Sequence, residues 1–194
     1  MLKIMRNNLE EQIFRSKKSL DEIVSLKDEI NSAIKIVYKT LKNKKKILIC
    51  GNGGSAAHAQ HLAAEFLVRL RPKVNRKPFA AISLAQDVST ITACGNDYNY
   101  HDLFSRNLEA LGVKNDLLIV ISTSGNSKNI IKVLKKARSN KIKSIALLGM
   151  KGGKAKGLSD LDIILSESNV ARIQEAQIFL GHYIFEKAED LLIR

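Results

Sequence analysis

The sequence has few cysteines and few aromatic residues. Of its 194 residues two are cysteine, Cys50 and Cys94, and none is tryptophan. Two cysteines provide no disulfide framework, and neither belongs to a metal-binding cysteine pair, so we interpret both as core thiols. No apolar run approaches the roughly 20 residues that span a bilayer, and the first residues lack the apolar block of a signal peptide. We therefore expect a cytosolic protein with no membrane partner.

Acidic residues are too few to balance the basic ones. The chain has 32 Lys and Arg against 19 Asp and Glu, a formal net charge of +13. Such an excess is typical of proteins that bind nucleic acid and of proteins that bind anionic substrates. The basic residues are spread along the chain, few aromatic residues lie among them, and no nucleic-acid module is recognisable. We expect mainly solvated lysines, with weak nucleic-acid contact as the minor alternative, and a positive field that attracts phosphate esters.

The length predicts one domain, because 194 residues bury one sizeable core and are short for two. In residues 1–45 apolar residues recur at helical spacing. The motifs that start at Ser19 and Ser25 resemble capping boxes, so we predict two helices with a break near Ser25. Residues 46–194 are expected to form the α/β part of the same domain.

From residue 46 on, short apolar runs alternate with helical segments. Each run is apolar throughout, as in parallel strands covered on both faces; the five runs are Ile47–Cys50, Phe79–Leu84, Leu117–Ile121, Ser144–Leu148 and Asp162–Leu165. Helices are expected at 55–70, 87–94, 101–111 and 127–140, and from Ala171 to the end. The pattern predicts a three-layer α/β/α sandwich with a doubly wound parallel five-stranded sheet and an N-terminal helical extension.

Two polar turns follow predicted strands and precede predicted helices. The first is Gly51-Asn52-Gly53-Gly54-Ser55 and the second Ser122-Thr123-Ser124-Gly125-Asn126-Ser127. Such turns direct backbone N–H groups and hydroxyls at one point, where the helix N-terminus adds partial positive charge. Neither has the P-loop or dinucleotide spacing, so we predict a small phosphorylated ligand rather than a nucleotide. Tight packing or helix capping is the alternative for either turn taken alone.

Four polar residues of the predicted helices are candidates for catalysis or metal binding. His61 and Glu65 are four apart and share a helix face, although such a pair is more often a surface contact. Gln174 and His182 are eight apart, loosely on one face two turns apart, and His182 alone would usually be a core histidine. The segment 95–98 between the second and third strands is predicted to be a polar turn that either holds a substrate hydroxyl or is an ordinary turn.

These motifs together resemble the sugar isomerase (SIS) domain family over essentially the full chain. The resemblance rests on separated motifs in the same order and spacing: Gly51–Ser55, Ala59-Gln60-His61, Glu65, Arg69, Gly95-Asn96-Asp97-Tyr98, Ile121–Ser127, Ala171-Arg172-Ile173-Gln174-Glu175 and His182. His58 differs, because the family often has Asp there, and Asn99 stands where Gly is common. From the residues alone, His58 and His101 are interpreted as surface or packing residues.

The resemblance implies isomerisation of sedoheptulose 7-phosphate to D-glycero-D-manno-heptose 7-phosphate, the first step toward the heptoses of lipopolysaccharide or capsule. It implies a homotetramer in which helices of residues 1–45 pack between subunits and active sites lie at subunit contacts. The resemblance implies that the phosphate is bound by Ser55, Ser122, Thr123, Ser124 and Ser127. It implies further substrate contacts by Asn52, Gly53, Gly54, Glu65, Asn96, Asp97 and Gln174. It also implies Zn²⁺ binding by His61, Glu65, Gln174 and His182.

For this reaction we expect Glu65 to be the base that moves a proton between C1 and C2, and His182 to be the acid/base at the oxygens. Zinc would polarise the carbonyl, yet a carboxylate bound to a metal is a poorer base, so Glu65 either alternates between the two roles or the metal is partly structural. The alternative function is a non-catalytic SIS protein that binds a sugar phosphate or a replication initiator. Such relatives lack the residues at the positions of Glu65 and His182.

Overall fold

The computed structural model describes residues 2–193, with side chains described from residue 8 on. Its centre is one parallel sheet with strand order β2-β1-β3-β4-β5. The strands are β1 (Ile47–Gly51), β2 (Ala81–Ser83), β3 (Leu117–Ser122), β4 (Lys143–Leu148) and β5 (Leu161–Ile164). All five predicted strands are confirmed. The bounds differ most for β2, which is shorter than the predicted run from Phe79 to Leu84.

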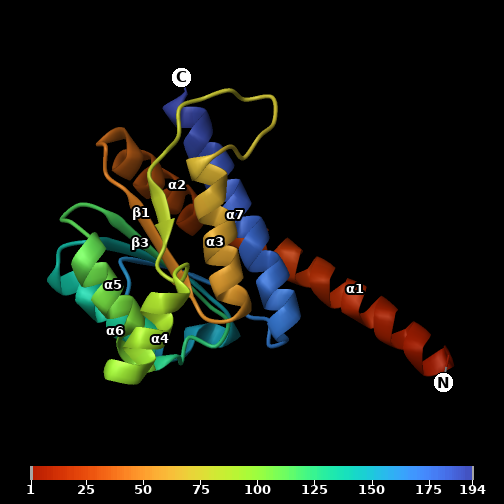
Figure 1. Ribbon diagram of the computed structural model, residues 1–194. Coiled ribbons are helices and arrows are strands. Elements are labelled where there is room, and N and C mark those ends of the chain that lie inside the picture. Colours follow the sequence, from red (N-terminus) through yellow and green to blue (C-terminus); the bar gives the residue numbers. More distant parts are fainter. Residues whose placement is uncertain (1, 194) are drawn as a thin grey trace.

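Helices cover both faces of the sheet, as the three-layer prediction requires (Figure 1). They are α1 (Leu2–Ser25), α2 (Lys27–Lys42), α3 (Gly54–Leu67), α4 (Val88–Asp97), α5 (Leu103–Leu111), α6 (Lys128–Ser139) and α7 (Val170–Leu192), with short 3₁₀ helices at Tyr100–Asp102 and Met150–Ala155. Helices α2, α3 and α7 pack on one face, and α5 and α6 on the other. Within the described residues no helix is long and apolar enough to cross a membrane.

Successive residues of β1 contribute to two different cores. Ile47 and Ile49 pack with α2, α3 and α7, whereas Leu48 and Cys50 pack with α5 and α6. Because side chains alternate across a strand, a strand covered on both faces must be apolar at every position. Both cysteines are buried and free, in agreement with their interpretation as core thiols, and burial raises the pKa of the Cys50 thiol.

The two N-terminal helices are confirmed, but the predicted capping boxes are wrong. Ser19 lies inside α1, buried, and its hydroxyl has no partner among the described residues. The Ser25 hydroxyl donates to the carbonyl of Glu22 at 2.7 Å instead of accepting a backbone N–H. The cap position of α2 is Leu26, which has no side-chain capping bond. The predicted break between α1 and α2 near Ser25 is therefore correct, but the capping boxes from which it was predicted do not form.

Helix α1 extends away from the body of the domain (Figure 1). Large apolar side chains on it are exposed, among them Leu9 at 64%, Phe14 at 67% and Val24 at 76%. Several exposed apolar side chains on a projecting helix are typical of an interaction surface.

The strand order puts a topological switch point between β1 and β3. The chain leaves β1 to form β2 on one side and crosses back to form β3 on the other. Ligands of doubly wound folds bind in the crevice outside the carboxyl ends of the strands at such a point. Both glycine-containing turns, 51–55 and 122–127, begin at these two strand ends, as the sequence predicted.

Candidate active site

The first turn requires glycine for two reasons. Gly53 has φ +56°, in the left-handed region that glycine adopts readily. A Cβ on Gly51 would lie 2.6 Å from the Cβ of Ser55, so only glycine allows β1 to turn directly into α3. Ser55 lies in the first turn of α3 and is 4% exposed. The turn thus presents the N-terminus of α3 and a hydroxyl at the switch point, an arrangement that binds anions.

The second turn is held by its own hydroxyl groups. The Ser122 Oγ accepts a hydrogen bond from the N–H of Gly125 at 3.1 Å, and the Ser124 Oγ accepts one from the N–H of Asn126 at 3.2 Å. Asn126 Oδ1 in turn accepts from the N–H of Lys154 at 3.1 Å, in the segment that follows β4. Ser127 is the cap residue of α6, although its side chain makes no capping bond. Its hydroxyl is therefore not used by the helix.

An amide pair joins the first turn to the start of α6, the helix that follows the second turn. Asn52 Nδ2 donates to Asn129 Oδ1 at 2.9 Å, and Asn129 Nδ2 donates back to Asn52 Oδ1 at 2.8 Å. The Tyr100 hydroxyl also donates to Asn52 Oδ1, at 2.8 Å. Neither Asn129 nor Tyr100 could be identified from the sequence, because neither belongs to a turn motif. Their bonds attach the first turn to α6 and hold the Asn52 side chain in place.

Helices α3 and α7 run side by side and bring the predicted acid and base together. Gly181 allows the close contact, since a Cβ there would lie 2.6 Å from the Leu62 side chain. His61 Nε2 lies 2.7 Å from His182 Nε2 and 3.3 Å from Glu65 Oε1. Donor atoms of these three side chains all lie within 4.8 Å of one another. The predicted meeting of Glu65 and His182 at one point is therefore observed within a single chain.

Burial favours the neutral imidazoles of His182 and of its neighbour His58. The pKa of His182 is lowered chiefly by burial and next by the neighbouring His61, while the Glu65 carboxylate opposes both effects. Burial also lowers the pKa of His58, with smaller contributions from His61 and His182. His58 therefore lies close enough to the cluster to interact electrostatically, and it is half-buried rather than a surface residue. A neutral His182 can accept or donate one proton near pH 7.

Gln174 lies apart from this cluster. A Cβ on Gly54 would be 2.6 Å from the Gln174 Nε2, so the amide covers the first turn of α3. His61 is seven residues further along α3, which corresponds to about 10 Å along the helix axis. The structure thus joins Gln174 to the first turn, and does not bring it to His61, Glu65 and His182 in the same chain.

The segment 95–98 is not the polar turn that we predicted. Gly95, Asn96 and Asp97 form the last turn of α4, and Tyr98 is its cap residue. Asn96 and Asp97 are exposed, and the Asn96 amide donates to Asp97 Oδ1 at 2.7 Å. Asp87, the residue directly before α4, caps the start of the helix by accepting from the N–H groups of Ser89 and Thr90. This strong cap extends the helix through residues whose composition is typical of a turn.

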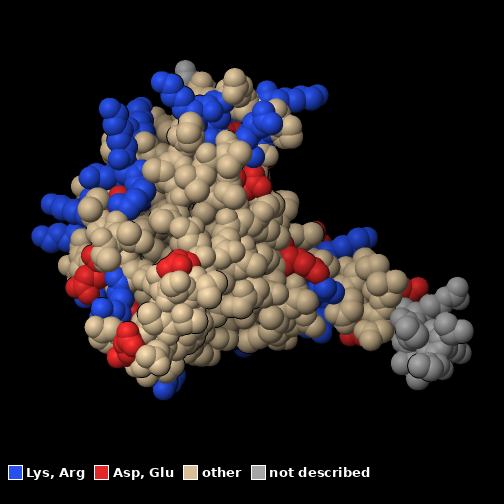
Figure 2. Space-filling view, viewed as in Figure 1, with Lys and Arg blue, Asp and Glu red and all other residues tan. Residues whose placement is uncertain are grey.

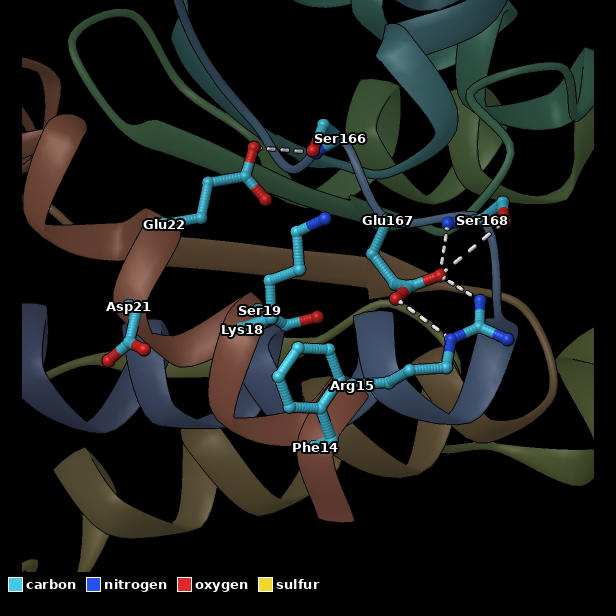
Figure 3. A pocket seen from close by; sticks show the side chains of 9 residues that line it. All are labelled: Phe14, Arg15, Lys18, Ser19, Asp21, Glu22, Ser166, Glu167 and Ser168. Atoms are coloured by element: carbon cyan, nitrogen blue, oxygen red, sulfur yellow. Dashed lines mark hydrogen bonds and ion pairs between the residues drawn. The ribbon is translucent and has the colours of Figure 1, made fainter. Parts of the chain in front are cut away.

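A hollow of about 580 Å³ lies between α1 and the segment that joins β5 to α7 (Figure 3). Arg15 and Glu167 form an ion pair across it. This pair, together with the N–H groups of Ser168 and Asn169, lowers the pKa of Glu167 to about 2. The hollow therefore contains a contact that attaches α1 to the domain, and it was not foreseen from the sequence.

Substitution of Gly125 by Ala is expected to damage the second turn. Gly125 has φ +62°, and a Cβ there would lie 1.9 Å from the carbonyl oxygen of Gly152, so the backbone has to move. We expect inorganic phosphate to bind at least tenfold more weakly, and the free energy of unfolding to fall by about 1–3 kcal/mol. Calorimetric titration and urea unfolding measure the two effects.

The matched control for that variant is Gly95→Ala. Gly95 is helical, and a Cβ there would meet nothing within 4 Å. This change is expected to preserve phosphate binding and to stabilise α4 by about 0.5–1 kcal/mol. Equal phosphate affinity in the two variants would show that the second turn does not bind phosphate.

Comparison with known proteins agrees with this geometry. The family model of the SIS domain matches residues 14–149. The phosphoheptose isomerase of Helicobacter pylori (strain ATCC 700392 / 26695) is 45% identical over 184 residues, which is 94% of this chain and 95% of that protein. The phosphoheptose isomerase of Campylobacter concisus (strain 13826) is 44% identical over 190 residues, 98% of each chain.

Solved structures of the same kind of enzyme are also similar. Phosphoheptose isomerase GmhA from Neisseria gonorrhoeae superimposes with a TM-score of 0.86 at 36% identity, covering 98% of this chain and 100% of that one. A phosphoheptose isomerase from Francisella tularensis gives 0.88 at 33% identity, with 97% and 98% covered. The chain therefore belongs to the SIS domain family and, within it, to the phosphoheptose isomerases.

Proposed function

We propose that this protein isomerises sedoheptulose 7-phosphate to D-glycero-D-manno-heptose 7-phosphate, in the cytoplasm, as the first step of ADP- or GDP-heptose synthesis for lipopolysaccharide or capsule. The observation that carries the proposal is the convergence of a carboxylate and an imidazole from two helices, Glu65 and His182. A regulatory SIS protein that only binds sugar phosphates has no use for this pair, so the non-catalytic alternative is not favoured.

The two turns are proposed to bind the phosphate. Ser55, Ser122, Thr123, Ser124 and Ser127 supply hydroxyls and N–H groups around the switch point. The N-terminus of α3 adds partial positive charge, and the net charge of +13 attracts the dianionic ester. Gly53 and Gly54 leave the backbone accessible, and Gln174, which lies against Gly54, is proposed to orient the substrate from α7.

The proton transfers are assigned to side chains of the cluster. Glu65 is proposed to remove the C1 proton of the ketose and to return it to C2 of the enediol. His182 is proposed to transfer a proton between the two oxygens, which is consistent with its lowered pKa. Arg76 donates to the backbone carbonyl of Glu65 at 2.7 Å and so helps to fix the end of α3 that carries the base.

The donor set also fits a zinc ion. In a tetrahedral zinc site neighbouring nitrogen and oxygen ligands are about 3.3 Å apart, as follows from bonds of about 2.0 Å. The 3.3 Å between His61 Nε2 and Glu65 Oε1 agrees with this value, whereas the 2.7 Å between His61 Nε2 and His182 Nε2 is a hydrogen-bond distance and would have to lengthen when the ion binds. We propose that His61, Glu65 and His182 hold the ion, and that when bound it supplies Lewis-acid polarisation of the carbonyl.

Gln174, the fourth proposed ligand, would come from a second subunit. It is eight residues from His182, about 12 Å along α7, and in this chain its amide lies at Gly54. We therefore infer that the complete site forms at subunit contacts of a homotetramer, and that α1 and α2 mediate the assembly. The exposed apolar side chains of α1 support this role.

Assembly is tested by mass measurement in solution. We expect the full chain to have four times the mass of one chain, and a variant with charged substitutions on the exposed face of α1, Phe14→Glu/Val24→Glu, to be smaller. Sedimentation equilibrium measures both. A monomeric full chain would exclude a site shared between subunits.

The activity is tested by turnover of sedoheptulose 7-phosphate against ketose phosphates with fewer carbons. We expect a higher kcat/KM for the seven-carbon substrate. A preference for a shorter ketose would keep the reaction class and change the substrate, whereas tight binding of sugar phosphates with no turnover would favour the regulatory alternative.

Removal of metal gives a separate prediction. Dialysis against a chelator is expected to lower kcat, and added Zn²⁺ to restore it, with about one zinc per chain by elemental analysis. His61→Ala is expected to reduce the zinc content itself. An unchanged rate in fully zinc-free protein would limit the metal to a structural role.

A further inference from the structure

The lysines of residues 42–46 differ in their contacts. Lys42 donates to the Tyr38 hydroxyl at 2.6 Å, and Lys46 forms an ion pair with Asp116 at 2.6 Å. Lys45, by contrast, contributes to the lining of a hollow. The structure thus separates lysines that stabilise the fold from one that is available to a ligand.

This hollow, which we call the lysine pocket, has a volume of about 450 Å³ and lies at the amino ends of the strands. It is bounded by α2, by the connection from α2 to β1, and by the start of β4. Its lining consists of four lysines and four other residues: Lys35, Lys39, Lys45 and Lys143, with Ile36, Thr40, Asn43 and Asn115. Figure 2 shows Lys and Arg side chains gathered over the end of the molecule where α2 leads into β1. The volume is within the range of about 300–1,000 Å³ that is usual for small-molecule sites.

The backbone holds these lysines on one side of the sheet. Lys35, Lys39 and Asn43 are four residues apart along α2 and its cap, so they share a helix face. Side chains alternate between the two faces along β4, so Lys143 is on the same face as Ile145 and Leu147. These two residues pack in the core beneath α2. Three separate segments thus bring their ammonium groups to one hollow.

The charge of the pocket is not neutralised by the protein. Its lining includes no carboxylate, and within residues 8–193 none of its four lysines forms an ion pair. Asp116, next to the lining residue Asn115, is 1% exposed, and its charge is matched by Lys46. The C-terminal end of α2 adds partial negative charge and offsets part of the field. Four clustered cations in a hollow repel one another and favour a multivalent anion.

We propose that the lysine pocket is a second anion site, separate from the turns at the carboxyl ends of the strands, and that it binds a small molecule with two or more phosphates. A phosphate monoester carries a charge of about −1.5 to −2, so two such groups come close to matching the four lysines. The side-chain amides of Asn43 and Asn115 supply further donors. No aromatic side chain lines the pocket for base stacking, so the geometry favours a small polyphosphate over single-stranded nucleic acid.

The test is a calorimetric titration of the assembled protein with tripolyphosphate, with orthophosphate for comparison. We expect saturable binding of one tripolyphosphate per chain. Lys39→Gln/Lys143→Gln is expected to weaken it about tenfold, because the two lysines supply half of the positive charge of the pocket. Lys17→Gln/Lys135→Gln is the matched control, because these two lysines are exposed, belong to α1 and α6, and change the net charge equally.

The two variants separate this proposal from the proposed isomerase function. Both are expected to keep the wild-type kcat, because neither pair lies at the turns or at Glu65. Equal loss of tripolyphosphate affinity in both variants, or no saturable binding, would overturn the proposal. It would also be overturned if only a single-stranded oligonucleotide bound in a manner that depended on Lys39 and Lys143.

Discussion

Replacing Glu65 by Gln is expected to lower kcat about a thousandfold, since a positioned general base contributes a factor of about 10²–10⁴. The amide keeps the shape of the side chain and removes its ability to accept a proton. Binding of the sugar phosphate is expected to change less than tenfold, because the turns, and not Glu65, are proposed to bind the phosphate. Steady-state kinetics and calorimetry measure the two quantities.

Glu186→Gln is the matched control for this variant. Glu186 lies on α7, is half-buried, and among residues 8–193 pairs only with the neighbouring Lys187, at 3.0 Å. The substitution is expected to leave kcat unchanged. A kcat of Glu65→Gln within a factor of ten of wild type would show that another group removes the proton.

Replacing Glu189 by Gln is expected to lower the free energy of unfolding by about 3–5 kcal/mol, because removal of one partner leaves buried charges uncompensated. The Glu189 side chain is fully buried and accepts from Arg71 at 2.8 Å and from Arg76. The Arg76 side chain is itself 3% exposed. These contacts attach the segment between α3 and β2 to α7.

The matched control here is Asp190→Asn. Asp190 binds the same Arg71, at 2.7 Å, but its side chain is 30% exposed. Its loss is expected to cost less than about 1 kcal/mol, as for other solvent-accessible pairs. Urea unfolding at one fixed protein concentration compares the variants, since the stability of an assembled protein depends on concentration. Equal destabilisation by the two changes would contradict the role assigned to burial.

The sheet could be predicted because its strands have to be apolar on both faces. A five-residue apolar run such as 117–121 is too short for a typical helix and is therefore interpreted as a buried strand. The polar turns that follow two of these runs indicated the switch point. Local capping signals were less informative. Ser19 matched a capping box but lies inside α1, where packing of the helix on the domain outweighs the local preference.

The site was predicted in part. His61 and Glu65 could be paired from their spacing, and the resemblance to the family added His182. Contacts between distant segments have no local signature, so the bonds of Asn129 and Tyr100 to Asn52 were missed. Gln174 and His182 show the limit of helical spacing, because eight residues put them on one face but about 12 Å apart along the axis.

The most direct test of the account is solvent deuterium incorporation during turnover in D₂O, followed by NMR of the product and of the remaining substrate. The account predicts deuterium at C2 of the aldose formed by the unchanged protein, and none in single-turnover mixtures of Glu65→Gln. Conversion and deuterium incorporation by Glu65→Gln at the rate of the unchanged protein would contradict proton transfer by Glu65.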